Sequence, residues 1–236
     1  MRNSMIKNIF FDFGGTLDLD GEHWYRHWRR SWAAVGADIP DERFKNAYFF
    51  AEHLLGELVC LLCNYSELIE LKCRLQADNL FSDKVLSPEF EQAVKTISAV
   101  TFAPIKSQAE KSQKVLSALK SKYTLGVISN FYGNLQESLD ELGLSAFLTY
   151  IIDSKKVNMR KPGTEIYNYA VQLCGCKPEE CLMVGDSYMQ DIVPAKSIGM
   201  VTAMLDTPQI GLKEKINYDN IDYVISSINE LTNIFL

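Results

Sequence analysis

The stretch Lys7-Asn-Ile-Phe-Phe-Asp-Phe-Gly-Gly-Thr-Leu17 joins a short apolar run to an aspartate and two glycines. A run of this length that does not alternate with polar residues is typical of a parallel strand buried on both faces. The carboxylate of Asp12 comes at the carboxyl end of this run, and ligands of open parallel sheets bind at that edge. The stretch therefore predicts a central strand over residues 7–12 that brings a carboxylate to a binding site.

Short apolar runs and helical patterns alternate through the second half of the chain. The apolar runs predict strands at 123–129, 150–153, 181–185, 201–205 and 223–225, and the patterns between them predict helices at 107–122, 134–142, 164–174 and 190–198. Strands that alternate with helices indicate a parallel sheet covered on both faces. We expect an α/β fold with a three-layer, Rossmann-like core and right-handed connections.

Residues 21–105 break this alternation, because they carry helical signals almost throughout and no convincing strand. The predicted helices cover 22–35, 41–55, 65–80 and 88–100, and two of them begin with acidic residues beside a proline, at 40–42 and 87–89. We therefore expect a catalytic core of residues 1–20 and 106–236, with an α-helical cap domain of residues 21–105 inserted after the first strand. Hinges are expected near 19–21 and 103–105.

The composition excludes several classes of protein. The 236 residues include 24 basic and 30 acidic side chains, giving a net charge of −6, whereas nucleic-acid binders carry a basic face. The most apolar stretch, 53–65, contains Glu57 and is shorter than the roughly 20 residues that span a bilayer. The N-terminus lacks the apolar run of a secretory signal. We expect a cytoplasmic protein with no membrane or nucleic-acid partner.

The six cysteines lie in apolar segments of a chain that is too long to need disulfide staples. Free thiols of a reducing compartment are therefore expected. The pair Cys60-x-x-Cys63 lacks a second pair at zinc-finger spacing, and Cys174-Gly-Cys176 does not supply one. A structural metal site at these cysteines is not favoured.

Polar side chains that can bind a phosphate or a metal follow the predicted strands. Asp12 follows the first strand, Ser129 and Asn130 end the second, and Asp186 follows the strand at 181–185. Carboxylates that face each other repel unless a cation lies between them, and Mg²⁺ prefers oxygen ligands. Each carboxylate taken singly could also be a helix cap, but their order along the chain favours a shared site.

In this order the residues resemble the sequence motifs of the haloacid dehalogenase (HAD) superfamily, whose members are mostly Mg²⁺-dependent phosphohydrolases. Residues Phe10-Phe-Asp-Phe-Gly-Gly-Thr-Leu17 are similar to the first motif and Val127-Ile-Ser-Asn130 to the second. Lys161-Pro162 is similar to the third motif, and Gly185-Asp-Ser-Tyr-Met-Gln-Asp191 to the fourth. The helical segment 21–105 is similar to the C1 cap of that family.

The resemblance implies a role for each matching residue. Asp12 would be the nucleophile that forms an aspartyl-phosphate. The phosphoryl group of a small phosphorylated metabolite would be held by Ser129 and the backbone of Asn130, its charge would be neutralised by Lys161, and Thr16 would fix the loop around it. The implied Mg²⁺ ligands are Asp12, the Gly14 carbonyl, Asp186 and Asp191, of which Asp191 could instead hold Lys161 or a water molecule.

Gly14 departs from the pattern of the phosphatases that this chain resembles. Those enzymes carry a second Asp at this position, which protonates the leaving group and then activates water. Its loss removes general acid–base help worth about 10²–10⁴ in rate. Substrates that carry good leaving groups, such as aryl or acyl phosphates, are therefore favoured. Asp18 or Asp20 of the same loop could replace the missing acid. A catalytically weak or inactive protein with a binding or regulatory role is the alternative.

Two relatives of the phosphatases differ at the same position. Dehalogenases of this fold carry a Tyr there and lack the full magnesium set, so the family name does not define the activity. Phosphonatases carry a small Ala there but need a cap lysine that forms a Schiff base. The candidate lysines are Lys45, Lys72, Lys84 and Lys95. None of them has a sequence setting that suggests a lowered pKa.

A basic face is predicted on the helix at 22–35. His23, Arg26, His27 and Arg30 share one side of it, next to Trp24, Trp28 and Trp32. The face could close over an anionic substrate, but we favour the simpler interpretation, in which the tryptophans are core and the cations are solvated. A metal bound by the two histidines is not favoured, because no third ligand is apparent.

Overall fold

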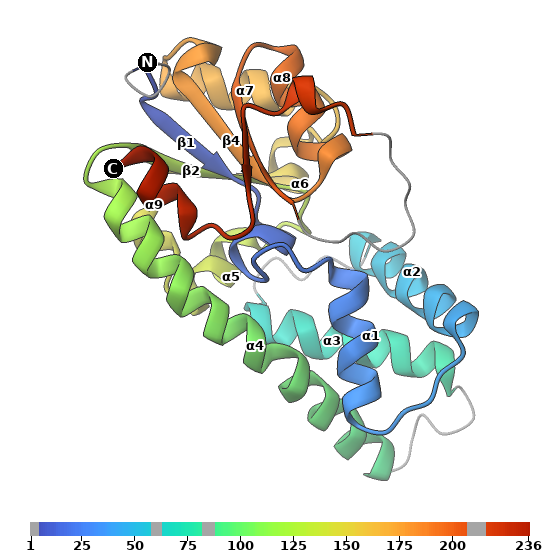
Figure 1. The fold of residues 1–236 in the computed structure, drawn as a ribbon. Coiled ribbons are helices and arrows are strands. Elements are labelled where there is room, and N and C mark those ends of the chain that lie inside the picture. Colours follow the sequence, from blue (N-terminus) through green and yellow to red (C-terminus); the bar gives the residue numbers. More distant parts are fainter. Residues whose placement is uncertain (1–4, 58–62, 82–87, 207–215) are drawn as a thin grey trace.

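The computed structural model describes residues 5–57, 63–81, 88–206 and 216–236. Its centre is a six-stranded parallel sheet with the strand order β3-β2-β1-β4-β5-β6 (Figure 1). The strands are β1 Asn8–Phe11, β2 Thr124–Ser129, β3 Tyr150–Asp153, β4 Cys181–Gly185, β5 Val201–Leu205 and β6 Tyr223–Ile225. The six predicted strands and the α/β class are thus confirmed.

Both faces of the sheet are covered by helices, which explains why its strands are apolar without alternation. On one face, Ile9 and Phe11 of β1 pack in a core with α4 (Pro88–Lys120), α5 (Leu135–Glu141) and α9 (Glu230–Phe235). On the other, Phe10 packs with α7 (Glu165–Cys174) and α8 (Val193–Ser197). All three side chains are fully buried, so successive residues of β1 supply opposite cores.

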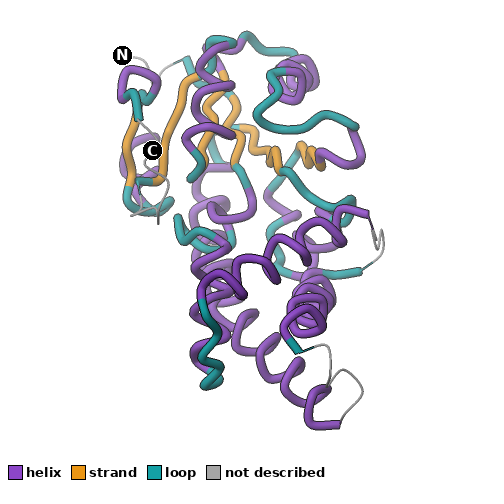
Figure 2. The backbone as a smooth tube through the Cα atoms, turned by 90° about the vertical axis from the view of Figure 1, so that its right-hand side faces the viewer, coloured by secondary structure: helices purple, strands orange, loops and turns teal. Residues whose placement is uncertain are grey.

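Three helices follow β1 and lie beyond the carboxyl edge of the sheet (Figures 1 and 2). They are α1 Trp24–Ala34, α2 Asp41–Glu57 and α3 Tyr65–Leu80, and with the first part of α4 we call them the inserted helices. They pack on one another through Trp28, Trp32 and Phe44, which are buried. The division into a core and a cap at residues 20/21 and 105/106 stays a prediction.

The predicted helices at 88–100 and 107–122 are one continuous helix, α4, so their predicted separation is wrong, while the hinge at 103–105 stays a prediction. Pro104 lies inside this helix, where its ring crowds the preceding turn and removes one backbone donor. The ring of His27 in α1 contacts that turn, with Nε2 2.8 Å from the Thr101 carbonyl oxygen.

Shorter elements complete the described chain. The predicted helix at 190–198 is split into a wide turn at Tyr188–Ile192 and the short α8, and α6 (Ser154–Val157) was not predicted. Three short 3₁₀ turns lie at Ser145–Phe147, Pro178–Glu180 and Tyr218–Asn220. In the described ranges, no helix is both long and apolar enough to cross a membrane.

Candidate active site

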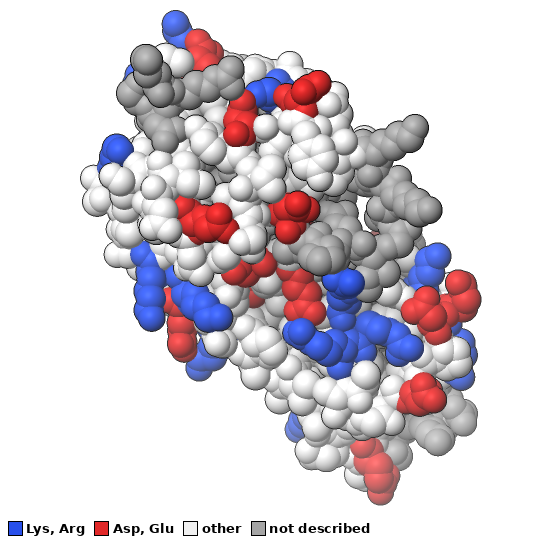
Figure 3. Space-filling model, in the orientation of Figure 1, with Lys and Arg blue, Asp and Glu red and all other residues white. Residues whose placement is uncertain are grey.

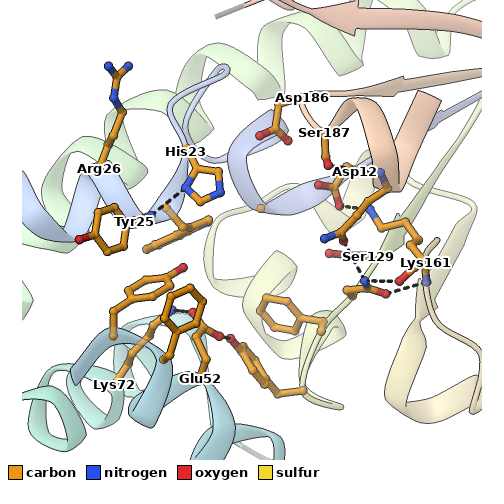
Figure 4. A pocket seen from close by; sticks show the side chains of 18 of the residues that line it. Asp12, His23, Tyr25, Arg26, Glu52, Lys72, Ser129, Lys161, Asp186 and Ser187 are labelled. Atoms are coloured by element: carbon orange, nitrogen blue, oxygen red, sulfur yellow. Dashed lines mark hydrogen bonds and ion pairs between the residues drawn. The ribbon is translucent and has the colours of Figure 1, made fainter. Parts of the chain in front are cut away.

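A cavity of about 780 Å³ lies between the carboxyl edge of the sheet and the inserted helices (Figure 4). One wall comes from the loops that follow β1, β2 and β4, and the opposite wall comes from α1, α2 and α3. Six of the residues singled out by the sequence motifs line the cavity, namely Asp12, Gly14, Ser129, Asn130, Lys161 and Asp186. Residues far apart in the sequence are therefore gathered at the edge where the sequence predicts a site.

Lys161 is the centre of the charged cluster. Its ammonium lies 2.7 Å from Oδ1 of Asp12 and 2.6 Å from Oδ1 of Asp191. The second oxygen of Asp191 accepts a hydrogen bond of 3.1 Å from the backbone N–H of Ser187. Both oxygens of the Asp191 carboxylate are thus engaged, and one of them fixes the direction of the lysine.

Asp186 completes the cluster from the end of β4. One carboxylate oxygen of each of Asp12, Asp186 and Asp191 lies within 4.8 Å of the others. The Thr16 hydroxyl donates a hydrogen bond of 3.2 Å to Asp186. Gly15 has a φ of +92°, and a Cβ added there would lie 2.6 Å from Oδ2 of Asp186. Glycine is therefore required at position 15 for both its backbone conformation and this close approach.

The cluster has an excess of negative charge in a buried setting. Burial, followed by the charges of Asp12 and Asp191, raises the pKa of Asp186 well above its usual range. Burial also raises the pKa of Asp191, to about 6, although Lys161 opposes the shift. Burial would lower the pKa of Lys161, but the neighbouring carboxylates outweigh it and raise that pKa. Such a site favours a further cation.

Ser129 ends β2 beside this cluster and Asn130 follows it, but the two side chains have different contacts. The Ser129 side chain is almost fully buried at the cavity wall, and within the described ranges its hydroxyl has no hydrogen-bond partner. The Asn130 amide group accepts from the N–H of Lys161 (2.9 Å) and donates to the Lys161 carbonyl (3.0 Å). It also donates to Gln190. The Asn130 side chain thus holds the backbone at Lys161 next to the end of β2.

Asp18 and Asp20 do not face the cavity. The carboxylate of Asp18 is fully buried and accepts hydrogen bonds from the Gly15 N–H (2.7 Å) and the Tyr65 hydroxyl (2.6 Å). Asp20 accepts from the Ser227 hydroxyl and from the backbone N–H of Ile228. Both carboxylates hold the loop after β1 in place. Their positions therefore do not support the expectation that Asp18 or Asp20 replaces the acid missing at Gly14.

The opposite wall carries a second polar group. Lys72 of α3 pairs with Glu52 of α2, and Glu52 also accepts a hydrogen bond from the Tyr132 hydroxyl. The Lys72 ammonium lies over the rings of Tyr48 at 4.8 Å and Trp24 at 5.4 Å from their centroids. Tyr132 follows β2, so this contact joins the loop after β2 to the inserted helices.

The predicted basic face of α1 is divided. His23 and Arg26 line the cavity, whereas His27 is fully buried and Arg30 pairs with Glu22 at 2.8 Å. Burial lowers the pKa of both histidines, so the imidazoles are neutral at pH 7. Basic side chains gather over α1 on the face of the molecule seen in Figure 3.

The tryptophans of α1 divide in the same way. Trp28 and Trp32 are buried in the core, as expected, but Trp24 lines the cavity. The core interpretation is therefore correct for two of the three. A helical pattern shows which residues share a face, but it does not show which end of that face meets the rest of the protein.

The other sequence candidates are distributed as follows. Of the four lysines considered for a Schiff base, Lys45 and Lys72 line the cavity and Lys84 lies outside the described residues. Cys60 also lies outside them, and the Cys63 side chain is buried and accepts a hydrogen bond from the Asn134 amide. The sequence interpretation missed Trp24, Glu52 and Tyr132 as cavity residues, because no motif marks them and only the packing of α1 and α2 on the core brings them there.

Comparisons with known proteins agree with this geometry. A family model described as haloacid dehalogenase-like hydrolase matches residues 6–199. The chain is 27% identical over 207 residues to the Rhythmically expressed gene 2 protein of Drosophila melanogaster, covering 84% of this chain and 64% of that protein. It is 31% identical over 157 residues to a Glyceraldehyde 3-phosphate phosphatase of Methanocaldococcus jannaschii, covering 64% and 68%. The chain thus spans about two thirds of the length of these relatives.

A solved structure shares the fold along the whole chain. The HAD-hydrolase YfnB of Bacillus subtilis, in a form bound to magnesium, matches with a TM-score of 0.58 at 16% identity and covers 98% of each chain. At this identity the likeness concerns the fold alone. Fold does not by itself define an activity, which has to be argued from the residues of the site.

Proposed function

The chain belongs to the haloacid dehalogenase-like hydrolases, and from that premise we propose that it is a Mg²⁺-dependent phosphohydrolase of a small phosphorylated metabolite. The observation that carries the proposal is the contact of the Lys161 ammonium with Asp12 at 2.7 Å, beside Asp186 and at the edge of the cavity. It unites a nucleophile, a cation for the phosphoryl group and oxygen ligands for a metal.

The donor set fits Mg²⁺. Three buried carboxylates face a single ammonium, so the cluster is negative without a further cation, and all its free ligand atoms are oxygens. The ion would be held by Asp12, Asp186 and the Gly14 carbonyl. Asp191, whose oxygens already bind Lys161 and Ser187, would position the lysine. When bound, Mg²⁺ supplies positive charge against the phosphoryl oxygens.

In the proposed reaction, a carboxylate oxygen of Asp12 attacks phosphorus and forms an acyl-phosphate bond. The bond from phosphorus to the leaving-group oxygen breaks, and the electron pair stays on that oxygen. The Ser129 hydroxyl and the Asn130 backbone hold the phosphoryl oxygens, and Lys161 neutralises their charge. Water then attacks the same phosphorus, which releases phosphate and restores the Asp12 carboxylate.

Gly14 narrows the substrates that this site can use. Glycine has no acid or base to give, and neither Asp18 nor Asp20 reaches the cavity wall. The leaving group therefore departs without a proton from residue 14, which favours leaving groups of low pKa. The alternative function, a weak or inactive protein that binds a phosphorylated ligand, also rests on Gly14.

An assay of the purified protein with Mg²⁺ on aryl and acyl phosphates separates the two functions. We expect turnover that is lost in Asp12→Asn, because the amide is not a nucleophile. Asp140→Asn, a change on the exposed face of α5, is the matched control and should keep full turnover. Turnover that Asp12→Asn retains, or none on any of these esters, would reject the phosphohydrolase proposal.

A further inference from the structure

The indole of Trp24 occupies the place next to Gly14 where a side chain would begin. A Cβ built on Gly14 would lie 3.2 Å from Nε1 of Trp24 and 3.5 Å from its Cδ1. Trp24 is the first residue of α1, and both residues line the cavity. The space that a side chain at position 14 would enter is therefore next to the indole nitrogen of Trp24, which comes from the inserted helices.

The Trp24 ring is held in this orientation by its neighbours. His27 and Tyr65 meet it edge-on, with ring centroids at 5.4 and 6.3 Å, and the Lys72 ammonium lies over it at 5.4 Å. In the parts of the chain that are described, the Trp24 N–H has no hydrogen-bond partner. The site thus presents a fixed donor to the cavity beside Gly14.

The wall around Trp24 is aromatic. Rings from Tyr48, Tyr65, Phe131 and Tyr132 also line the cavity, which has a volume typical of sites for small ligands. Two charged groups among these rings, Lys72 and Glu52, are paired with each other, and Arg26, Asp41 and Lys45 also line the cavity. A flat unsaturated group packs well against the ring surface of this wall.

We propose that the Trp24 N–H donates a hydrogen bond to the leaving-group oxygen, and that the substrates are aryl phosphates whose ring packs in this aromatic wall. The inference rests on the proposed phosphohydrolase function and names its substrate class. An indole N–H is a donor that does not release its proton, so it stabilises charge on the leaving oxygen without protonating it.

Because no acid protonates it, the leaving group has to be stable as an anion, and an aryl oxygen has this property. When Asp12 attacks, the bond from phosphorus to the aryl oxygen breaks and its electron pair remains on the oxygen, which leaves as an aryloxide. A phenolic hydroxyl has a pKa near 10, compared with about 16 for water, and solvent supplies the proton afterwards. The absence of an acid at Gly14 and the aromatic wall thus favour the same class of substrate.

The test uses two kinds of phosphate monoester, substituted phenyl phosphates and glycerol phosphate, and one acyl phosphate, acetyl phosphate, all at saturating Mg²⁺. The quantity measured is kcat/KM, which reports the steps up to release of the leaving group. We expect the phenyl phosphates to exceed glycerol phosphate by at least about 100-fold, the range of a lost general acid. They should also exceed acetyl phosphate, whose leaving group is better but has no ring.

Trp24→Phe keeps a ring and removes the N–H. We expect kcat/KM to fall by about 10-fold for 4-nitrophenyl phosphate and by more for phenyl esters with poorer leaving groups, because those carry more charge on the oxygen. The dependence on leaving-group pKa therefore becomes steeper, which a purely structural defect would not produce. Trp28→Phe is the control, since the buried Trp28 N–H has no partner either and does not line the cavity.

The outcomes distinguish this inference from the function on which it rests. A loss in Trp24→Phe that is equal for all esters, or no loss, would overturn the role of the N–H. Acetyl or glycerol phosphate used as well as the phenyl esters would overturn the substrate class, while loss of that turnover in Asp12→Asn would leave the phosphohydrolase function intact. No Asp12-dependent turnover on any ester would reject both. Thermal melting of each variant shows that it is folded.

Discussion

The ammonium of Lys161 lies 2.7 Å from the carboxylate of Asp12, and both side chains are almost fully buried. The two residues are 149 positions apart in the sequence, and the fold brings them together because β1 is central to the sheet. A buried ion pair contributes little net stability, but removing one partner leaves an uncompensated charge. The contact therefore links the chemistry of the site to the stability of the fold.

Lys161→Met is expected to lower both the stability of the fold and the turnover. Three buried carboxylates would then face one another, so the free energy of unfolding without Mg²⁺ should fall by about 3–5 kcal/mol at pH 7. Turnover should fall at least 100-fold, because no ammonium neutralises the phosphoryl group. Urea unfolding and kcat/KM measure the two effects. Lys156→Met, which removes a half-exposed ammonium 3.8 Å from Glu137, should change neither by much. A Lys161→Met protein with normal turnover would contradict the proposed role.

Gly15→Ala tests the packing of Asp186 in the carboxylate cluster that we propose binds Mg²⁺. Gly15 and Gly36 both have positive φ, so an alanine strains the backbone at either place. Only at Gly15 would the new Cβ meet the Asp186 carboxylate, whereas nothing lies within 4 Å at Gly36. We expect Mg²⁺ to raise the melting temperature of Gly36→Ala as in the wild type, but much less in Gly15→Ala. Equal Mg²⁺ shifts in both variants would show that Asp186 does not bind the metal.

The buried carboxyl of Asp18 should make stability depend on pH. Burial, opposed by the Tyr65 and Gly15 hydrogen bonds, raises its pKa to about 7, against about 4 in the unfolded chain. The folded state then binds this proton more strongly, so the contribution is fully present below about pH 4 and is lost as the pH rises to about 7. The loss is up to about 4 kcal/mol, at 1.36 kcal/mol for each pKa unit.

Asp18→Asn removes this titration and keeps an acceptor for the Gly15 N–H. In urea unfolding with EDTA, the variant should gain stability relative to the wild type between pH 5 and pH 8. A difference between the two proteins that is the same at both pH values would rule out the raised pKa. The comparison needs EDTA, because a bound cation near Asp12 would favour the charged carboxylate.

Restoring an acid at position 14 should need a change at Trp24 as well. The backbone of Gly14, with φ −73° and ψ 116°, accepts any side chain, but the new Cβ would crowd the indole nitrogen at 3.2 Å. We expect Gly14→Asp alone to gain little on glycerol phosphate, and the double variant with Trp24→Phe to gain at least about 10-fold. A double variant that is no better than the wild type on this ester would weaken the argument from the missing acid.

The fold could be predicted from the sequence because each of its signals is local. The apolar strands, the capped helix starts and the order of the motifs predict all six strands and the edge at which Asp12, Ser129, Lys161 and Asp186 meet. The junction at Pro104 could not be predicted, because proline usually ends a helix, whereas α4 runs on through this one.

The positions of the side chains on the cavity wall opposite Asp12 depend on contacts between elements that are distant in the sequence. Trp24 has the same helical pattern as Trp28 and Trp32, and only the way α1 meets the loop after β1 turns its N–H toward Gly14. The contact of Glu52 with Tyr132 likewise joins α2 to the loop after β2, which are distant in the sequence. Side chains of this kind set specificity, and a single sequence does not reveal them.

The central claim is that Asp12 carries the phosphoryl group during turnover. Because Gly14 gives no base to activate water, the aspartyl-phosphate should break down slowly and accumulate. The measurement is rapid acid quench of the protein with 4-nitrophenyl phosphate and Mg²⁺, followed by peptide mass analysis. We expect an initial burst of nitrophenol close to one per protein, with a phosphoryl group on the peptide that contains Asp12 and none in Asp12→Asn. Turnover without a burst or phosphopeptide, and retained by Asp12→Asn, would contradict it.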